Sequence, residues 1–327
     1  MNKNKYPKPA LIAITKRGDT IEGLHYGWIC VVNKEKTIIY KKGNIFDQTF
    51  LRSALKPIQA IPIIDNNIEL TPKELAITCG SHSGSRKHLK VLDNFIKNQK
   101  LKLKDLQCGI HLPFDEDEST RLRKLGIKPS PLHNNCSGKH LGMLSVCKKN
   151  KWDLKTYLDI NHPIQKAIIK NIEELSCTKN ISIAIDGCGV PTFALSILDI
   201  AIMFSNFTYL SNKKYLKIIS AMTKYPFYVG SKNQIDTEIM AISPERLIAK
   251  VGAEGIIIVA HNGNSAVVKI ADGSPRARAI VILQLLTKLN WLQKSKIKNS
   301  ILEEVLKGEF KNHAGKKVGF IKTLIDC

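Results

Sequence analysis

The sequence lacks any hydrophobic run long enough to span a membrane as a helix. Hydrophobic residues make up 43% of its 327 residues, but no segment reaches the roughly 18 uninterrupted apolar residues that a spanning helix needs. The apolar run after the basic N-terminus, residues 10–14, is too short for a signal peptide. These absences predict a soluble, cytoplasmic protein with a sizeable core and no membrane partner.

Arginine is scarce, although the chain carries a formal net charge of +22. Nearly all of the positive charge is lysine, scattered along the chain instead of gathered into one basic segment. Arginine reads phosphates and bases better than lysine does, and zinc-finger spacing, an RNA-recognition sequence and a basic arm are missing. We therefore expect a lysine-rich solvated surface and no nucleic-acid partner. The opposite hypothesis predicts retention on a polyanion column at moderate salt.

Two further absences concern nucleotides and disulfides. The chain has no Gly-rich phosphate loop of either standard kind, so a nucleotide cofactor is not expected. Eight cysteines in 327 residues do not make a disulfide scaffold. Cys136 and Cys188 differ from the others because glycine and polar residues surround them. In a reducing compartment, such cysteines favour a metal or catalytic role.

Strand-like segments lie at both ends of the chain, and helix-like segments lie between them. Strands are predicted over 10–15, 28–33, 37–40, 247–251, 255–260 and 265–270, and a further buried strand over 181–185. Helices are predicted over 71–78, 86–97, 136–149, 163–174, 194–204, 215–224, 231–242 and 277–289. This order predicts a three-layer α+β protein whose mixed antiparallel sheet is assembled from both ends of the chain. We expect one domain over 1–327, with β-rich ends 10–45 and 245–327 and a helical, loop-rich middle 50–240.

The first candidate for chemistry is Ser53 with Lys56, three residues later at the start of a helix. This spacing puts both side chains on one face of the helix. A serine hydroxyl attacks weakly unless a base takes its proton, and a lysine can do so when burial or another cation, such as Arg52, lowers its pKa. The alternative is coincidence, because Ser-x-x-Lys arises by chance in a lysine-rich chain.

The second candidate is the stretch 133–142, which brings together a thiol (Cys136) and an amine (Lys139) where a loop enters a helix. With Cys188, these groups could hold zinc, which favours sulfur and nitrogen donors. The ordinary alternative is a helix entry with two reduced cysteines and a solvated lysine. A third segment, residues 81–84, is either part of a site or an ordinary Ser/Gly turn.

Four motifs occur in an order and at a spacing that resemble the L-asparaginase II family of the Rhizobium etli type, often called class 3 asparaginases. The motifs are Arg52-Ser53-Ala54-Leu55-Lys56-Pro57, Cys79-Gly80-Ser81-His82-Ser83, Asn135-Cys136-Ser137-Gly138-Lys139-His140 and Asp186-Gly187-Cys188-Gly189-Val190-Pro191-Thr192. The resemblance runs from about residue 10 to the strand near residue 270. It implies a fold like that of serine β-lactamases and serine-dependent glutaminases, a homodimer, and hydrolysis of L-asparagine to L-aspartate and ammonia.

The resemblance also implies roles for individual residues. The catalytic positions match Ser53, Lys56, Ser81 and, in a Lys-x-Gly-Ala context, Lys250. The metal site, two cysteines and a lysine around a zinc ion, matches Cys136, Lys139 and Cys188. Asp186 matches an acidic residue next to the substrate and the metal, and we expect Arg52 and His82 to contact the substrate as well. The segment 231–238 matches the family's substrate-contact region less clearly.

Together these features predict an amidohydrolase. Ser53, deprotonated through Lys56, would attack the side-chain amide of asparagine, and Ser81 with Lys250 would form a second pair that relays protons. Zinc would help to bind the substrate. Two alternatives remain: a zinc-stabilised small-ligand-binding protein without turnover, and a β-lactamase-like acyl hydrolase. The latter is disfavoured because the chain lacks Ser-Asp-Asn and Lys-Thr-Gly elements.

Overall fold

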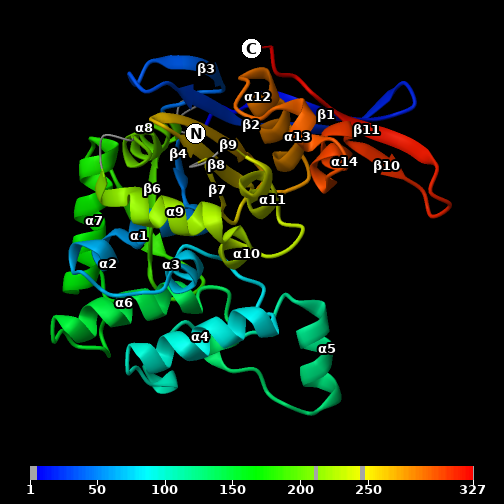
Figure 1. The fold of residues 1–327 in the computed structure, drawn as a ribbon. Coiled ribbons are helices and arrows are strands. Elements are labelled where there is room, and N and C mark those ends of the chain that lie inside the picture. Colours follow the sequence, from blue (N-terminus) through cyan, green and yellow to red (C-terminus); the bar gives the residue numbers. More distant parts are fainter. Residues whose placement is uncertain (1–5, 210–212, 244–246, 327) are drawn as a thin grey trace.

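A large antiparallel sheet forms the upper part of the molecule in Figure 1, and helices cover it and extend below it. The computed structural model describes residues 6–209, 213–243 and 247–326. Residue 245, the predicted start of the C-terminal β-rich region, lies outside them. The strands of the large sheet are β1 (Ala10–Arg17), β2 (Thr20–Val32), β3 (Ile38–Lys42), β7 (Ile248–Val251), β8 (Ile256–His261), β9 (Asn264–Ile270), β10 (Glu309–Lys311) and β11 (Lys317–Thr323).

The order of these strands joins the two ends of the chain. It runs β10-β11-β1-β2-β9-β8-β7, with β3 paired to the far end of β2, and all pairs are antiparallel. N-terminal strand β1 lies beside C-terminal β11, with Ala13 opposite Thr323. Strand β2 lies beside β9, with Gly27 opposite Ile270. The predicted mixed α/β fold, with an antiparallel sheet assembled from both ends, is thus confirmed.

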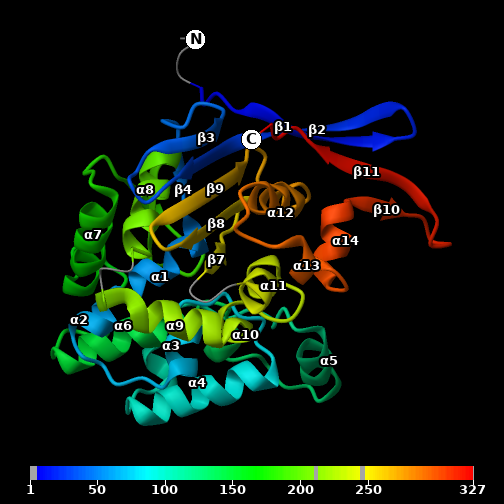
Figure 2. The same ribbon diagram turned by 45° about the horizontal axis from the view of Figure 1, so that its top comes forward.

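Strands β8 and β9 are buried along almost their whole length, so both faces of the sheet are covered at its centre. Helices α8 (Ile197–Phe207) and α12 (Arg278–Lys288) both pack against them (Figure 2). Burying aliphatic side chains on both faces is the main source of the fold's stability. The short helices α13 (Lys294–Ile297) and α14 (Ile301–Lys307) lie outside α12.

A second, small sheet lies in the middle of the chain. It consists of β4 (Gln48–Phe50), β6 (Pro191–Ser196) and β5 (Ser182–Ile185), in that order. The prediction of a buried strand over 181–185 is wrong in its burial, because β5 is an edge strand and Ile185 is 80% exposed. The alternation of apolar and polar residues can indicate a strand, but it does not show whether that strand lies at the edge of a sheet with only one neighbour.

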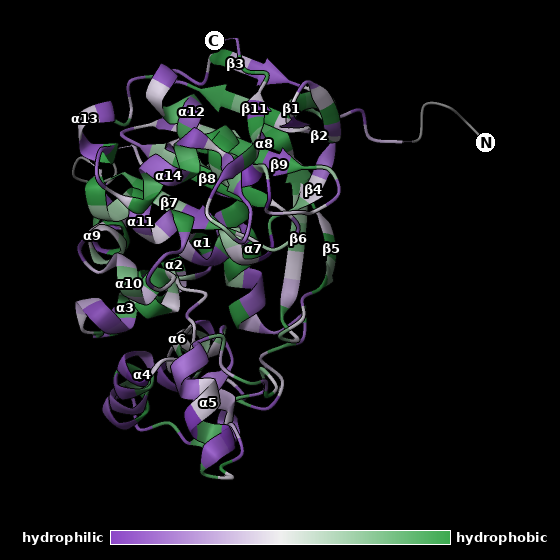
Figure 3. Cartoon of the chain, turned by 90° about the vertical axis from the view of Figure 1, so that its right-hand side faces the viewer, coloured by the Kyte–Doolittle hydropathy of each residue, from purple (hydrophilic) through white to green (hydrophobic). Residues whose placement is uncertain are grey.

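The helical middle of the chain lies at the β7 end of the large sheet (Figure 1). Its elements are the 3-10 turn η1 (Arg52–Leu55) and helices α1 (Lys56–Gln59), α2 (Ile61–Asp65), α3 (Pro72–Thr78), α4 (Arg86–Asn98), α5 (Glu116–Lys124), α6 (Ser137–Lys149), α7 (Pro163–Ser176), α9 (Leu216–Lys224), α10 (Pro226–Val229) and α11 (Ile235–Ile242). Helices α4 and α5, far from the sheet, are largely hydrophilic (Figure 3). No helix in the described part of the chain is long and apolar enough to cross a bilayer.

Most predicted helices are confirmed, and the capping residues explain their boundaries. Helix α3 begins as predicted at the Thr71 cap, whose hydroxyl accepts from Glu74 N while the Glu74 carboxylate accepts from Thr71 N. The helix predicted over 194–204 is wrong at its start, since Ala194–Ser196 belong to β6 and pair with β4. The Ser196 hydroxyl caps α8 instead, accepting from Asp199 N at 3.0 Å. Similarly, the helix predicted from residue 231 begins only at Ile235.

Helices α3 and α6 pack very closely at Gly138. A Cβ atom at this position would lie 2.4 Å from the backbone oxygen of Ile77, with no flexible side chain to move aside. We expect Gly138→Ala to destabilise the protein by about 1–3 kcal/mol, the usual cost of overpacking. Gly187→Ala is the matched control, because nothing lies within 4 Å of its Cβ position. Urea denaturation measures both, and equal midpoints would contradict the close packing.

Candidate active site

The ammonium group of Lys56 is the centre of the candidate site. Lys56 is the first residue of α1, and its side chain is fully buried. Its Nζ atom contacts the hydroxyl of Ser81 at 2.9 Å, the carbonyl oxygen of Asn135 at 3.3 Å, and the carbonyl oxygen of Gly80. The structure therefore joins the first, second and third sequence motifs at one nitrogen atom.

The surroundings of Lys56 favour the loss of its proton. Its pKa is lowered from 10.5 to about 8, mainly by burial, with the nearby cations of Lys139 and Lys250 contributing and two cysteines opposing. The Lys56 Nζ atom donates to the Ser81 hydroxyl and to the two carbonyl oxygens, which together match the three N–H donors of an ammonium group. Once this group has lost a proton, the neutral amine can accept the proton of the adjacent Ser81 hydroxyl. Lys56 is thus placed to act as a base.

Ser53 lies in η1, one turn before Lys56, and is partly exposed while Lys56 lies beneath it. None of the hydrogen bonds of the described residues uses the Ser53 hydroxyl, so Ser81, and not Ser53, is the serine that touches Lys56 here. Arg52, directly before Ser53, has a φ of 50°, which is a strained value for a side chain of this size. The backbone at the start of this turn packs closely against Gly252, the residue after β7. A Cβ atom at Gly252 would lie only 2.5 Å from the backbone oxygen of Leu51.

Asp186 and Arg52 form an ion pair beside Ser53. The Arg52 Nε atom donates to Asp186 Oδ1 at 2.7 Å, and the backbone N–H of Gly187 donates to the same oxygen at 2.8 Å. Burial alone would raise the pKa of Asp186, but the cations of Lys139 and Arg52 outweigh it and hold the pKa below its usual value. Asp186 lies in the turn between β5 and β6, which Gly189 allows with its φ of 87°.

The predicted metal residues lie together and are buried. Cys136 caps α6, Lys139 lies in its first turn, and Cys188 follows Asp186 in the β5–β6 turn. Lys139 Nζ donates to Cys188 Sγ at 3.1 Å. A hydrogen bond from Cys188 lowers the pKa of the Cys136 thiol well below its usual value against the effect of burial, and the cations of Lys56 and Lys139 add to this. One thiolate is thus already stabilised.

This donor set fits zinc chemically. It offers two sulfur atoms and one amine, and the Asp186 carboxylate lies 4.0 Å from Cys188 Sγ. Among the described residues no group of three or more His, Cys, Asp or Glu side chains could hold a metal ion. A site at these residues therefore depends on the unusual ligand Lys139, which would have to lose its proton to bind.

Lys250 lies near the site but has a different partner from the predicted one. It is almost fully buried on β7, and its Nζ atom contacts Asp236 Oδ2 at 3.2 Å and Val251 O at 2.9 Å. Asp236, on α11, also accepts from Val251 N at 3.1 Å. The structure thus pairs Lys250 with a carboxylate, and does not bring it into hydrogen-bond contact with Ser81.

Breaking the Lys250–Asp236 pair should destabilise the fold strongly. Asp236→Asn leaves the buried Lys250 cation without its counter-charge, so we expect a loss of about 3–5 kcal/mol in the free energy of unfolding. Glu304→Gln serves as the control, since the Lys307–Glu304 pair is exposed, and should leave the unfolding midpoint unchanged. Chemical denaturation followed by circular dichroism measures both. Equal midpoints in the two variants would show that the buried pair is dispensable.

His82 holds the Ser81 loop against α6. Its ring is fully buried, its Nε2 atom lies 2.9 Å from the Ser137 hydroxyl, and its Nδ1 atom accepts from Gly84 N at 3.2 Å. Burial lowers the pKa of His82 well below its usual value, so the ring is neutral. Both nitrogens are used within the protein, which gives His82 a place in the support of the site and no free atom for the substrate contact predicted from the sequence.

Sequence reasoning did not identify three groups of the site: the backbone carbonyls of Gly80 and Asn135, and the carboxylate of Asp236. Gly80 and Asn135 lie inside motifs that were singled out for their side chains, but a motif does not indicate which carbonyl points at a lysine. Asp236 lies in the segment 231–238, which was noted only for its weaker match. Its buried position on the first turn of an amphipathic helix was the available signal.

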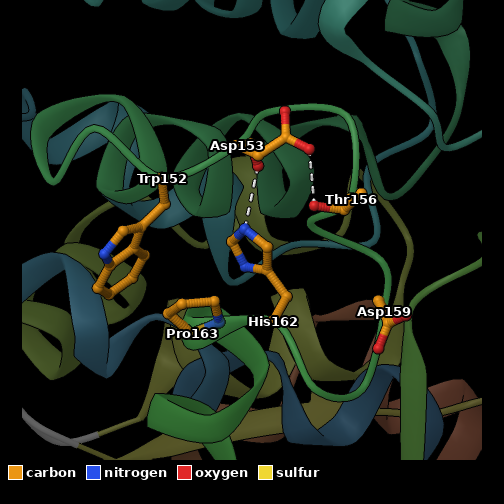
Figure 4. Close-up of a pocket in the computed structure, with 6 residues that line it drawn as sticks. All are labelled: Trp152, Asp153, Thr156, Asp159, His162 and Pro163. Atoms are coloured by element: carbon orange, nitrogen blue, oxygen red, sulfur yellow. Dashed lines mark hydrogen bonds between the residues drawn. The ribbon is translucent and has the colours of Figure 1, made fainter.

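A separate pocket of about 370 Å³ is formed by the segment between α6 and the start of α7 and contains none of the predicted residues. It is lined by Trp152, Asp153, Thr156, Asp159, His162 and Pro163 (Figure 4). The Asp153 carboxylate accepts from Thr156 Oγ1 at 2.8 Å, and His162 Nε2 donates to Asp153 O at 3.0 Å. These polar groups hold the loop before α7 in place.

A family model described as L-asparaginase II matches residues 13–323. A search of curated proteins finds no match. Similar solved structures include a β-lactamase from Mycobacterium bovis, 12% identical, with a TM-score of 0.42 and coverage of 81% of this chain and 95% of that one. Another, Mglu in its native form, is 11% identical, with a TM-score of 0.41 and coverage of 80% and 63%.

Proposed function

The chain belongs to the L-asparaginase II family, and from that premise we propose that it is an amidohydrolase that converts L-asparagine to L-aspartate and ammonia. The observation that carries the proposal is the buried Lys56, whose pKa is lowered to about 8 and whose nitrogen contacts a serine hydroxyl. A neutral lysine next to a serine can deprotonate it at a pH close to neutrality. Amide hydrolysis through an acyl-enzyme needs such a pair.

The proposed reaction has two displacements. Ser53, the partly exposed serine one turn from Lys56, attacks the side-chain amide carbon, and its proton passes to Lys56 directly or through Ser81. Lys56 then gives this proton to the amide nitrogen, which leaves as ammonia when the C–N bond breaks. Water, deprotonated by Lys56, hydrolyses the ester and frees the serine. Hydrogen bonds of a base are often long before substrate binds, so the missing Ser53–Lys56 contact is compatible with this role.

Charges around Ser53 support recognition of an amino acid. Arg52 and Asp186 are each other's partners in the free protein. An amino-acid substrate brings both an α-carboxylate and an α-ammonium group, which can exchange with this ion pair and leave every charge compensated. Lys250, held by Asp236, adds a positive field that favours the oxyanion formed at the amide carbon.

We also propose that Cys136, Lys139 and Cys188 hold a zinc ion. Zinc bound there would supply a Lewis acid for the substrate's α-amino and carboxylate groups. The protein would keep these ligands buried and stabilise the thiolate form of Cys136. Asp186, 4.0 Å from Cys188 Sγ and paired with Arg52, would connect the zinc ligands with the groups around Ser53.

Metal removal tests this part of the proposal. We expect elemental analysis to find zinc in the purified wild-type protein and to find it lost in Cys188→Ser, because one of the two sulfur ligands is gone. Cys177→Ser, which changes an exposed cysteine, should keep it. In the metal-free protein we expect a higher KM for asparagine and a smaller change in kcat. An unchanged KM would remove zinc from substrate binding.

The activity itself is tested by ammonia release. We expect purified protein to release ammonia from L-asparagine, and mass spectrometry of enzyme quenched during turnover to find the acyl group on Ser53. An acyl group on Ser81 would exchange the roles of the two serines. If no ammonia appears with asparagine or glutamine, the rival hypothesis of a ligand-binding protein without turnover is favoured. Hydrolysis of a chromogenic cephalosporin instead would favour a β-lactamase-like acyl hydrolase.

Several expectations from the sequence stay predictions. The family resemblance predicts a homodimer, and the composition predicts a cytoplasmic protein without nucleic-acid or membrane partners. Light scattering of the purified protein at several concentrations measures the oligomeric state. A polyanion column at moderate salt separates specific nucleic-acid binding from the weak retention that a net charge of +22 gives any protein.

A further inference from the structure

A groove of about 560 Å³ lies between α3 and α4, away from the predicted catalytic and metal residues. Lys73 lines it from the first turn of α3, and Lys87 and Lys90 line it from one face of α4. Tyr228 forms part of the wall. The groove is larger than the pocket in Figure 4, and the proposed amidohydrolase mechanism does not use it.

The charges in this groove are unbalanced. Lys73, Lys87 and Lys90 are exposed, and none of them belongs to an ion pair within the described part of the chain. Glu74 is the only acidic residue of the lining, and its carboxylate is already occupied. Glu74 Oε2 accepts from Thr71 N at 2.8 Å, and Glu74 Oε1 accepts from Asn98 Nδ2 at 2.8 Å. The lining therefore carries three exposed positive charges against one buried, hydrogen-bonded carboxylate, which leaves the concave surface net positive.

Aromatic rings hold two of these ammonium groups near the groove. Lys73 Nζ lies 5.7 Å from the ring centre of Tyr225 and 5.9 Å from that of Tyr228. Lys87 Nζ lies 5.7 Å from the ring centre of Phe227. Such contacts keep a lysine side chain over a ring while its N–H donors stay available to a ligand. The cations are thus partly ordered before any ligand arrives.

We propose that this groove binds a small oxyanion with two or more negative charges, of the phosphate or phosphate-monoester class. Lysine binds phosphate as a point charge, and three such charges around one concavity favour a multivalent anion over a single carboxylate. The exposed Asn94 adds an amide donor on the α4 side. A volume of 560 Å³ accommodates such a small molecule but is closed to a folded partner.

The groove is connected to the candidate active site through α3. Lys73 and Glu74 lie in the first turn of this helix, and Ser81 follows its last turn. On the groove's other wall, the backbone after Tyr228 accepts from Ser81, since Ser81 N donates to Val229 O at 2.8 Å. An anion in the groove would therefore clamp the two segments that hold Ser81, and we expect it to raise the melting temperature.

The experiment is a titration with inorganic phosphate by calorimetry and thermal unfolding, at an ionic strength kept constant with sodium chloride. The test variant carries Lys73→Gln, Lys87→Gln and Lys90→Gln. The matched control carries Lys294→Gln, Lys296→Gln and Lys298→Gln, which remove the same charge from the region around α13. We expect saturable binding to wild type and control, and at least tenfold weaker binding to the test variant.

Two results would overturn the proposal. Absence of saturable binding to wild type would show that the groove has no anion site. Equal weakening in both variants would show a general attraction of phosphate to a chain of net charge +22. Because all substituted lysines are exposed, unchanged circular dichroism is expected for both variants. The readout is binding, so its outcome is independent of whether the protein releases ammonia from asparagine.

Discussion

Ser53→Ala is expected to reduce ammonia release from asparagine by about 10⁴-fold or more, because removal of a nucleophile leaves only binding and field effects. Ser81→Ala should also abolish measurable release, since it takes away the hydroxyl that contacts Lys56 at 2.9 Å. The two variants should nevertheless differ in one respect. Ser81→Ala retains Ser53 and can still form a trace of acyl-enzyme over long incubation, whereas Ser53→Ala cannot.

The control for both is Ser220→Ala, an exposed serine on α9 outside the site. It should keep the wild-type rate. Circular dichroism must show that all three variants are folded before rates are compared. A full rate in Ser53→Ala or in Ser81→Ala would remove that serine from the mechanism, and a trapped acyl group in Ser53→Ala would make Ser81 the nucleophile.

Lys56→Met should lower kcat by about 10²–10⁴-fold, the range that a positioned general base contributes. Methionine has a similar length but no basic nitrogen that could accept a proton. In the wild-type protein, Lys56 must be neutral to act, and burial lowers its pKa to about 8. We therefore expect kcat/KM to rise with pH through about pH 8 and to level off above it. A flat profile from pH 6.5 to 9.5 would contradict Lys56 as the base.

The same pKa has a consequence for stability, which gives an independent measurement. Lys56 has a lower pKa in the folded chain than its ordinary 10.5, so between about pH 8 and 10.5 the unfolded chain binds more protons at this residue. The free energy of unfolding should therefore rise with pH across this window. Lys56→Met should lose this part of the slope. Lys97→Met, on the exposed side of α4, should retain it.

Local patterns were enough to predict much of the fold. The Thr71-Pro72-Lys73-Glu74 sequence carries its own cap and carboxylate, so α3 could be placed to the residue. Strands β1, β2, β3, β7, β8 and β9 followed from apolar segments separated by turn sequences, whereas β10 and β11 in the lysine-rich C-terminal segment were not predicted. By contrast, Ala194–Ser196 could not be assigned locally, because these residues form a strand only through pairing with β4, about 145 residues earlier in the chain.

The same difference between local patterns and long-range contacts holds for the candidate site. Ser53, Lys56, Ser81, Cys136, Lys139 and Cys188 were all proposed from motifs, and contacts within a motif depend mainly on helical spacing. The partner of each lysine depends on packing between distant elements. Lys56 meets Ser81 because the loop after α3 passes the start of α1, and Lys250 meets Asp236 because α11 covers β7. The periodicity of the sequence does not determine these contacts between distant elements. The structure therefore has the Lys56–Ser81 and Lys250–Asp236 contacts in place of the predicted Ser81–Lys250 contact.

The pairing of β1 with β11 sets the order in which the chain can be completed during synthesis. Strand β1 leaves the ribosome before its partner β11, which follows about 300 residues later. At 5–20 residues per second, roughly 15–60 seconds pass with this edge of β1 exposed. An unpaired strand edge is a template for aggregation. Because so long a loop closes slowly, we expect the nascent chain to be more prone to aggregation than the folded protein.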